Sequence, residues 1–305
     1  MVVTDELRAA CAEVAERARH VRIDVAAIKR YAASLPAAPA GAATLLDDHA
    51  ERERAAWYWL TLDAINFGSG WFPTLAKAAG GTGYSTIADG LKRRFETEGP
   101  WSAAELQSLT AADLAAVTGQ DPDHELMGLF AASLNDVGVR LTADYSGSPL
   151  ALVDSAGGSA VALVEILAGW SSLEDVSTYD ELRLPFLKRA QILAADLSRA
   201  GAAEWNDIGK LTMFADNLVP HVLRLDGILS FDRRLVTKIE LGELLEHGAG
   251  SEVEIRACAV RAVELIAAAS PRPVTAAALD ALLWNRGQGR DYKARPRHRS
   301  RTTAY

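Results

Sequence analysis

Cysteine is nearly missing from this chain of 305 residues, which contains only Cys11 and Cys258. Two cysteines this far apart form neither the disulfide framework of a small secreted domain nor a cysteine-based zinc site. The six histidines, at positions 20, 49, 124, 221, 247 and 298, show no metal-ligand spacing with one another or with a cysteine. We therefore expect no metal site, and a cytoplasmic location is the default.

Long apolar runs are also missing. No stretch approaches the ~18 uninterrupted apolar residues of a membrane span. Residues 1–10 carry acidic side chains where a secretory signal peptide has a basic segment followed by an apolar one. The expectation is a soluble, intracellular protein with no membrane contact.

Positive charge is in deficit over most of the chain. Lys and Arg number 32 against 40 Asp and Glu, a net charge of −8, and an acidic body repels a long nucleic acid. Seven basic residues nevertheless stand between Arg286 and Arg301 with Asp291 as the only acid, so this segment carries +6 and the rest of the chain −14. The basic C-terminal tail, residues 286–305, is either a solvated end or the site of a small phosphorylated ligand.

Familiar catalytic motifs are absent as well. The glycine-rich segment at 80–83 lacks the Lys-Ser/Thr pair that completes a phosphate-binding P-loop, and no nucleophile elbow occurs. No internal repeat of solenoid length is visible. None of these standard motifs therefore indicates the function of the chain.

Helical periodicity dominates what is present. With 49% hydrophobic and 24% charged residues the composition is that of a globular protein, and apolar residues recur at three- and four-residue spacing. This pattern predicts an all-α fold, a single globular domain over residues 1–305. We expect helices over residues 5–20, 24–34, 47–66, 85–97, 123–142, 159–168, 185–199, 217–226, 232–246, 252–269 and 275–287.

Punctuation residues set the expected boundaries of these helices. Thr275 is placed to cap one helix, and Pro185 suits the first turn of another, where a missing N–H costs nothing. Residues 35–41, with Pro36, Pro39 and Gly41, form the best linker. Loops are expected at 80–83 and 146–149.

One polar and aromatic patch runs from Trp57 to Pro73, where a helix enters a glycine-containing loop. Asp63 and Asn66 stand three residues apart and so share a helix face. Two interpretations remain open for this patch. It is either a buried capping network or a base-stacking pocket with hydrogen-bonding edges.

Two further patches contain a charged residue among apolar ones. Lys188 stands near the start of a predicted helix, where a lysine gains nothing from the helix dipole and is most often solvated. Asp216 stands where the next helix begins, and its simplest role is an N-cap that stabilises the helix by ~1 kcal/mol. A capping carboxylate is held rigidly and can also face a pocket, so the structural and catalytic roles of Asp216 are compatible.

Together these patches resemble the queuosine salvage family of queuosine 5′-phosphate N-glycosylases. The resemblance spans most of the chain. Its motifs are Asp63-x-x-Asn66-Phe67 followed by Trp71, Gly83-Tyr84, Lys188 to Leu193, Thr212 to Asp216, Glu252 to Arg256, Leu283-Trp284 and the closing His298 to Tyr305.

The resemblance implies an all-α single domain similar to DNA glycosylases, cleavage of the bond between ribose and the deazaguanine base queuine, and no metal or other cofactor. It implies that Asp216 is the catalytic carboxylate and Lys188 a site residue. The patches, the motif from Glu252 to Arg256 and the tail add the expected substrate-binding residues, which are Asp63, Asn66, Phe67, Trp71, Phe214, His221, Arg256, His298 and Arg299.

Two segments depart from the family pattern. Relatives commonly carry Tyr-Arg after the aspartate and Gln after the proline, where this chain has Asn217-Leu218 and His221. Relatives also keep Asn-Phe close to the Trp, whereas here residues 68–70 intervene. The contacts at the edge of the base pocket are expected to differ accordingly.

The chemistry of Asp216 fits this reaction. Breaking an N-ribosidic bond builds positive charge at the anomeric carbon, and a fixed carboxylate lowers that barrier electrostatically. A 7-deazapurine lacks the N7 that ordinary purine hydrolases protonate, so any help to the leaving base acts at another edge of the ring. We expect a hydrolase that takes a small nucleotide, not a long nucleic acid.

Two alternatives remain beside this prediction. A glycosylase that acts on a nucleic acid would use the same chemistry, but the −14 body would have to meet many phosphates. A non-catalytic queuine- or nucleotide-binding protein would keep the aromatic pocket and have no use for Asp216 facing the ribose. The sequence leaves the oligomeric state open.

Overall fold

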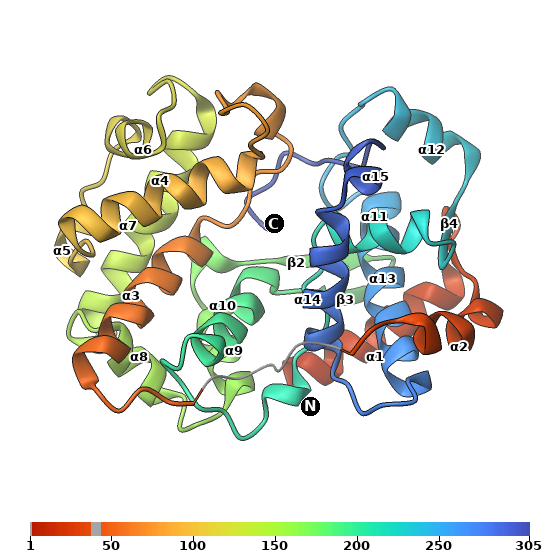
Figure 1. The fold of residues 1–305 in the computed structure, drawn as a ribbon, viewed down its shortest axis with the longest axis horizontal. Coiled ribbons are helices and arrows are strands. Elements are labelled where there is room, and N and C mark those ends of the chain that lie inside the picture. Colours follow the sequence, from red (N-terminus) through yellow and green to blue (C-terminus); the bar gives the residue numbers. More distant parts are fainter. Residues whose placement is uncertain (1, 38–43) are drawn as a thin grey trace.

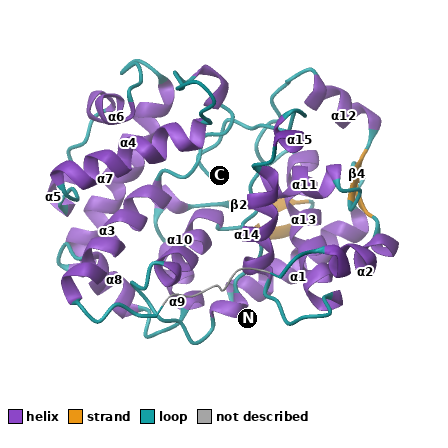
Figure 2. Cartoon of the chain, in the orientation of Figure 1, coloured by secondary structure: helices purple, strands orange, loops and turns teal. Residues whose placement is uncertain are grey.

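The computed structural model describes residues 2–37 and 44–305, and helices dominate this part of the chain (Figure 2). Its α-helices are α1 (Val3–Arg17), α2 (Val25–Ser34), α3 (His49–Ala64), α4 (Gly83–Glu98), α5 (Ala103–Leu106), α6 (Ala111–Thr118), α7 (Glu125–Tyr145), α8 (Pro149–Ser155), α9 (Ala160–Leu167), α10 (Lys188–Arg199), α11 (Leu218–Leu225), α12 (Arg233–Glu240), α13 (Gly250–Ala269), α14 (Ala276–Gly287) and α15 (Arg290–Lys293). Short 3-10 helices are η1 (Phe72–Thr74), η2 (Ser171–Leu173) and η3 (Ile208–Lys210).

Two small antiparallel sheets accompany the helices. In one, β1 (Val21–Ile23) pairs with β4 (Leu229–Phe231), and in the other β2 (Val176–Tyr179) pairs with β3 (Leu182–Pro185). The second pair is a hairpin that leads the chain directly toward α10. The expected fold class is thus confirmed as mostly helical, but the strands were not expected, since segments of three or four residues carry too little periodicity to be recognised.

Two hydrophobic clusters form the interior. One gathers the buried side chains of α3 to α10, and the other those of α1, α2 and α11 to α14 together with the strands. Figure 1 shows the two groups of helices side by side. The clusters meet where the chain passes from one to the other, because Phe186 belongs to the second cluster and Leu187 to the first.

A second crossing occurs just before α11. Met213 and Ala215 pack in the second cluster, whereas Phe214 between them packs in the first. Each crossing is followed immediately by a charged residue, Lys188 at the first and Asp216 at the second. The fold therefore places both residues at the border between the two clusters.

The basic C-terminal tail begins in α14 and α15 and ends between the two groups of helices, where the C label stands in Figure 1. The Gly68 N–H donates a hydrogen bond to the Tyr305 carbonyl oxygen at 3.2 Å. A Cβ atom added to Gly70 would lie 2.4 Å from the Ser300 carbonyl oxygen, so glycine is needed there for the tail to pack. The intervening residues 68–70, which depart from the family pattern, thus receive the tail.

The expected helices are present with shifted ends. Each of the eleven expected ranges overlaps an observed helix, and Thr275 caps α14 as expected by accepting a hydrogen bond from the Ala278 N–H at 3.2 Å. The short helices α5, α6, α8 and α15 were not expected. Because α8 begins at Pro149, the expected loop at 146–149 is shorter than predicted.

The expected role of Pro185 is wrong. Pro185 ends strand β3 opposite Val176, and α10 begins only at Lys188. A strand end tolerates proline as well as a first helical turn does, because the ladder needs no N–H there. Of the expected linker at 35–41, Pro39 and Gly41 lie outside the described residues.

In the described ranges, no single helix has the length and apolar content of a membrane span. Among the described helices, one pair, α8 and α9, has this length and apolar content when taken together. These two helices are bent by 117° relative to each other.

Candidate active site

A cavity of about 360 Å³ opens at the border between the two hydrophobic clusters. This volume lies in the usual range for small-molecule sites. Its wall contains aromatic rings and charged groups. The aromatic rings are Phe67, Phe72, Tyr84, Phe214, Trp284 and Tyr305. The charged groups are Asp216, Asp280, Lys77, Lys188, Lys293, Arg295, Arg297 and Arg299.

Asp216 lies just before the start of α11, and its carboxylate is held by backbone N–H groups of that helix. Its Oδ1 accepts hydrogen bonds from the N–H groups of Leu218 at 2.8 Å and Val219 at 3.1 Å. Asp216 thus binds the first two N–H groups of the helix, as a capping side chain does, although the N-cap position itself is Asn217, and the same side chain lines the cavity. Within the described residues no protein group donates to Oδ2, so one oxygen is fixed and the other is available to a ligand.

Lys188 enters the cavity from the start of α10. Its Nζ donates to the carbonyl oxygen of Asn66 at 2.8 Å and to the Asn66 Oδ1 at 3.0 Å. Burial lowers the pKa of Lys188, while the carboxylates of Asp216 and Asp63 act in the opposite direction. The side chain is 5% exposed, so the interpretation of Lys188 as a solvated helix lysine is wrong.

The backbone before Lys188 is unusual. Leu187 has a φ of 46°, in the left-handed region that a branched side chain rarely adopts. Its N–H donates to the carbonyl oxygen of Asp175 at 3.1 Å, and the N–H of Lys188 donates to the Asp175 Oδ2 at 3.0 Å. Strained backbone persists only where its surroundings hold it, and Asp175 supplies that hold.

Asn66 and Asp63 connect Lys188 to the protein interior. The Asn66 Nδ2 donates to the Asp63 Oδ1 at 3.2 Å. Burial raises the pKa of the Asp63 carboxyl well above its usual range, and Asp196 raises it further. The patch is therefore a buried polar network around Asp63, while Asn66 and Phe67 of the same patch line the cavity.

A second carboxyl group, Asp280 of α14, shares the cavity with Asp216. It is 5% exposed, and its Oδ1 accepts a hydrogen bond from the Phe214 N–H at 3.0 Å. Burial raises the pKa of Asp280 well above its usual range, and the Asp216 charge raises it further. The two carboxyl groups thus differ, because Asp216 is held by backbone N–H donors at a helix start and Asp280 is buried against another negative charge.

The aromatic rings come from both clusters. Tyr84 of α4 and Trp284 of α14 meet edge to face with ring centroids 5.8 Å apart. Phe67 packs against Phe130 at 5.0 Å. Aromatic rings in the wall of a cavity suit a planar base, since stacking on aromatic side chains tolerates any heterocycle.

The tail supplies four of the six basic residues that line the cavity in the described part of the chain. Lys293, Arg295, Arg297 and Arg299 all line it. In the described part of the chain none of these four lies within ion-pair distance of a carboxylate, whereas Arg286 pairs with Asp226 at 3.2 Å. Burial lowers the pKa of Arg297, and its Nε has no hydrogen-bond partner among the described residues.

The structure separates the eleven expected site residues into two sets. Those that line the cavity are Asp216, Lys188, Asn66, Phe67, Phe214 and Arg299. Those that lie behind its wall are Asp63, Trp71, His221, Arg256 and His298.

Four of the five side chains behind the wall form hydrogen bonds with other described residues, whereas the buried Nε2 of His298 has no such partner. The Trp71 Nε1 donates to the Glu125 Oε2 at 2.7 Å, and one ring nitrogen of His221 bonds to the Tyr292 carbonyl oxygen at 3.0 Å. Burial lowers the pKa of His221 to about 4 and that of His298 to about 3. These side chains support the wall and do not reach a ligand in the cavity.

Asn217, a departure from the family pattern, has a clear structural role. Its Nδ2 donates to the Ser69 Oγ at 2.9 Å and to the His298 carbonyl oxygen at 3.0 Å. The residue therefore joins the start of α11 to both the 68–70 loop and the tail.

Asp280, Arg297 and Tyr305 are among the wall residues that were not expected as site residues, although Arg297 and Tyr305 lie in the basic tail. For Asp280 a signal existed, because it is a lone acid on the stripe formed with Ala276, Leu279 and Leu283, all buried. For Arg297 and Tyr305 nothing local distinguishes them from neighbouring tail residues.

The chain is similar in sequence to known proteins over most of its length. The sequence model of the queuosine salvage protein family matches residues 46–305. A queuosine 5′-phosphate N-glycosylase/hydrolase from Sphaerobacter thermophilus is 35% identical over 266 aligned positions, which cover 83% of this chain and 82% of that protein. A protein of the same description from Mus musculus is 30% identical over 328 positions, covering 96% of each chain.

Proposed function

Since the chain belongs to the queuosine salvage protein family, we propose that it hydrolyses the N-glycosidic bond of queuosine 5′-phosphate and releases queuine for salvage. Relatives at 30–35% identity carry this activity in their descriptions. The observation that supports the proposal most directly is the Asp216 carboxylate, which is fixed by two backbone N–H donors and faces an aromatic cavity.

Asp216 carries the chemical step. As the bond between C1′ and the base nitrogen breaks, the bonding electrons leave with the base and positive charge grows on the ribose. A carboxylate that is already oriented stabilises this charge without reorganisation during the reaction. Water then adds to C1′, and its proton passes to the Asp216 carboxylate.

Asp280 assists the departing base. A buried carboxyl group beside another carboxylate stays protonated, so Asp280 has a proton to donate. That proton passes to an acceptor of the base and neutralises it as it leaves. The proton gained by Asp216 returns to Asp280 through solvent, and the balance is one water consumed for one C–N bond broken.

Lys188 and the tail hold the ribose phosphate. Lys188 is anchored on Asn66 close to Asp216, and Arg297 and Arg299, which form no ion pair with another described residue, provide a phosphate site. A phosphate bound away from the breaking bond orients the ribose over Asp216, so its binding energy serves catalysis. The helical scaffold fits the DNA-glycosylase-like fold implied by the family resemblance, and this similarity is part of the proposal.

A comparison of three substrates tests the function. We would incubate the protein with queuosine 5′-phosphate, with queuosine and with an intact queuosine-containing tRNA, and measure free queuine by chromatography. Release from the nucleotide supports the proposal. Release from tRNA alone would establish a nucleic-acid glycosylase, and tight binding without release would establish a carrier.

A further inference from the structure

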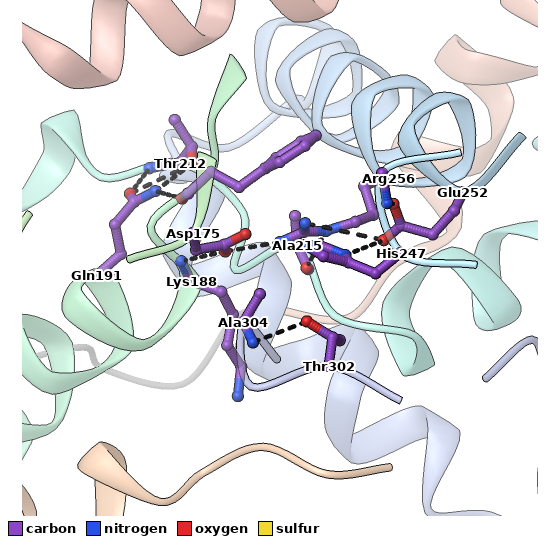
Figure 3. A network of polar contacts seen from close by, with 12 residues as sticks. Asp175, Lys188, Gln191, Thr212, Ala215, His247, Glu252, Arg256, Thr302 and Ala304 are labelled. Atoms are coloured by element: carbon purple, nitrogen blue, oxygen red, sulfur yellow. Dashed lines mark hydrogen bonds and ion pairs between the residues drawn. The ribbon is translucent and has the colours of Figure 1, made fainter. Parts of the chain in front are cut away.

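Arg256 of α13 is completely buried and does not line the cavity, yet it contacts the backbone beside Asp216. Its Nε donates a hydrogen bond to the Ala215 carbonyl oxygen at 2.9 Å, and Ala215 directly precedes Asp216. Figure 3 shows this guanidinium in the middle of a polar network that reaches both catalytic segments. One arm of the side chain therefore holds the backbone at the second crossing between the clusters.

The other arm reaches the first crossing. The Arg256 Nη2 donates to the Asp175 Oδ2 at 2.7 Å, and the same oxygen accepts the Lys188 N–H at 3.0 Å. The Asp175 carbonyl oxygen also accepts the N–H of the strained Leu187. A single carboxylate oxygen thus connects the guanidinium to the start of α10.

Aromatic rings and a second acid enclose the same guanidinium. It lies 3.9 Å from the ring centroid of Phe186 and 4.4 Å from that of Tyr305, a residue of the cavity wall. Its Nη1 lies 3.8 Å from the Glu252 Oε1. The side chain therefore also supports the part of the tail that closes the cavity.

This arrangement is not explained by stability alone. Placing charges in a protein interior costs desolvation free energy, and apolar residues of similar volume often stabilise a fold equally well or better. A planar guanidinium, in contrast, binds two acceptors in fixed directions, which the ammonium of lysine does not reproduce. Arg256 therefore contributes fixed directions of binding to its two acceptors.

We propose that Arg256 is a positioning residue for the reaction, which sets the spacing between the Asp216 carboxylate and the Lys188 ammonium by joining Ala215 to Asp175. This inference rests on the proposed function. Arg256 acts through these two partners and touches no substrate, which replaces its expected role in substrate binding.

The test uses two variants and one control in the full-length protein. Arg256→Lys keeps the charge and loses the two-directional contact, and Asp175→Asn keeps the side-chain volume and loses the charged acceptor. Arg52→Lys is the matched control, since the Arg52 guanidinium also holds a carbonyl oxygen, that of Ala202, away from the cavity. We would measure kcat and KM for queuosine 5′-phosphate, with folding checked by circular dichroism and melting temperature.

The expected result is a change in kcat with little change in KM. Misplacement of a catalytic group by about 1 Å commonly costs about 10²-fold in rate, so we expect losses of that order in each variant at position 256 or 175 and none in the control. The double variant should lose little more than the worse single variant, because both act on one connection.

A purely structural role predicts something else. In that case either variant that folds would show a lower melting temperature with kcat per folded molecule within about twofold of the parent, and the proposal would be overturned. A rise in KM at constant kcat would overturn it as well. If the parent protein itself releases no queuine, the proposed function has failed and not this inference.

Discussion

Replacement of Asp280 by asparagine tests proton donation to the leaving base separately from stabilisation of the positive charge on the ribose. The amide oxygen of the variant still accepts the Phe214 N–H that Asp280 now binds at 3.0 Å, so the wall keeps its shape. What disappears is the proton. General acid catalysis commonly contributes about 10² to 10⁴ in rate, and we expect Asp280→Asn to lose kcat in that range on queuosine 5′-phosphate.

The pH dependence follows from the direction of the pKa shift. Burial and the Asp216 charge raise the pKa of Asp280, while the Phe214 N–H and the more distant Lys188 and Arg199 lower it in part. The active form is the protonated one. The rate should therefore fall as pH rises through this raised pKa, and Asp280→Asn should lack this alkaline decline.

A second substrate makes the experiment decisive. A ribosyl 5′-phosphate with 4-nitrophenolate as leaving group needs no proton for departure, so Asp280→Asn should hydrolyse it almost as fast as the parent does. Asp216→Asn should be slow on both substrates, because both reactions pass through a positively charged ribose. Equal losses of Asp280→Asn on both substrates, or no loss on either, would refute the assignment of Asp280 as the acid.

Three further predictions follow from the same geometry. Asp216→Asn should lower kcat by about 10² to 10³ while nucleotide affinity measured by calorimetry survives; turnover within a few-fold of the parent would leave Asp216 as a cap only. Arg297→Ala or Arg299→Ala should reduce the ratio of kcat/KM for the nucleotide to kcat/KM for the nucleoside. Added salt should lower kcat/KM for the nucleotide only, as the screening length falls to about 8 Å near 0.15 M. Equal kcat/KM values of the parent protein for both substrates at low salt would contradict a phosphate site. Burial depresses the pKa of His298 from 6.5 to about 3, so its contribution to stability is complete above pH 6.5 and is lost as pH falls toward 3. Urea unfolding should show that His298→Asn loses less stability than the parent between pH 7 and pH 5, and parallel losses would disprove the neutral buried histidine.

Local signals were sufficient for much of this molecule. Helix periodicity and caps such as Thr275 are decided by neighbours within a few residues, which is why the expected helices were found. The capping position of Asp216 was also accessible locally, because an acid before a new helix commonly caps it, whereas its catalytic role was implied by the family resemblance. The strands and the end of β3 at Pro185 were not, since pairing with a distant segment decides them.

Contacts between distant segments decided the rest of the site. Trp71 and His221 carry the residue types of a binding pocket, but packing turned both toward protein partners. In the sequence, Asp280 is a lone acid among the apolar residues of its helix. It lies near Asp216 because α14 packs beside α11.

The sequence by itself determined that the chain is mostly helical, that its body is acidic with a basic tail, and which motifs it shares with its family, because these properties depend on composition and short-range spacing. Only the tertiary structure decided which side chains face the cavity. The cavity exists where two hydrophobic clusters meet, and its walls come from residues 66–84, from α10 and from the segment that runs from α11 to the tail, which are separated along the chain. Since burial and neighbouring charge set the protonation of a carboxyl group, the different roles of Asp216 and Asp280 emerge only when these segments are brought together.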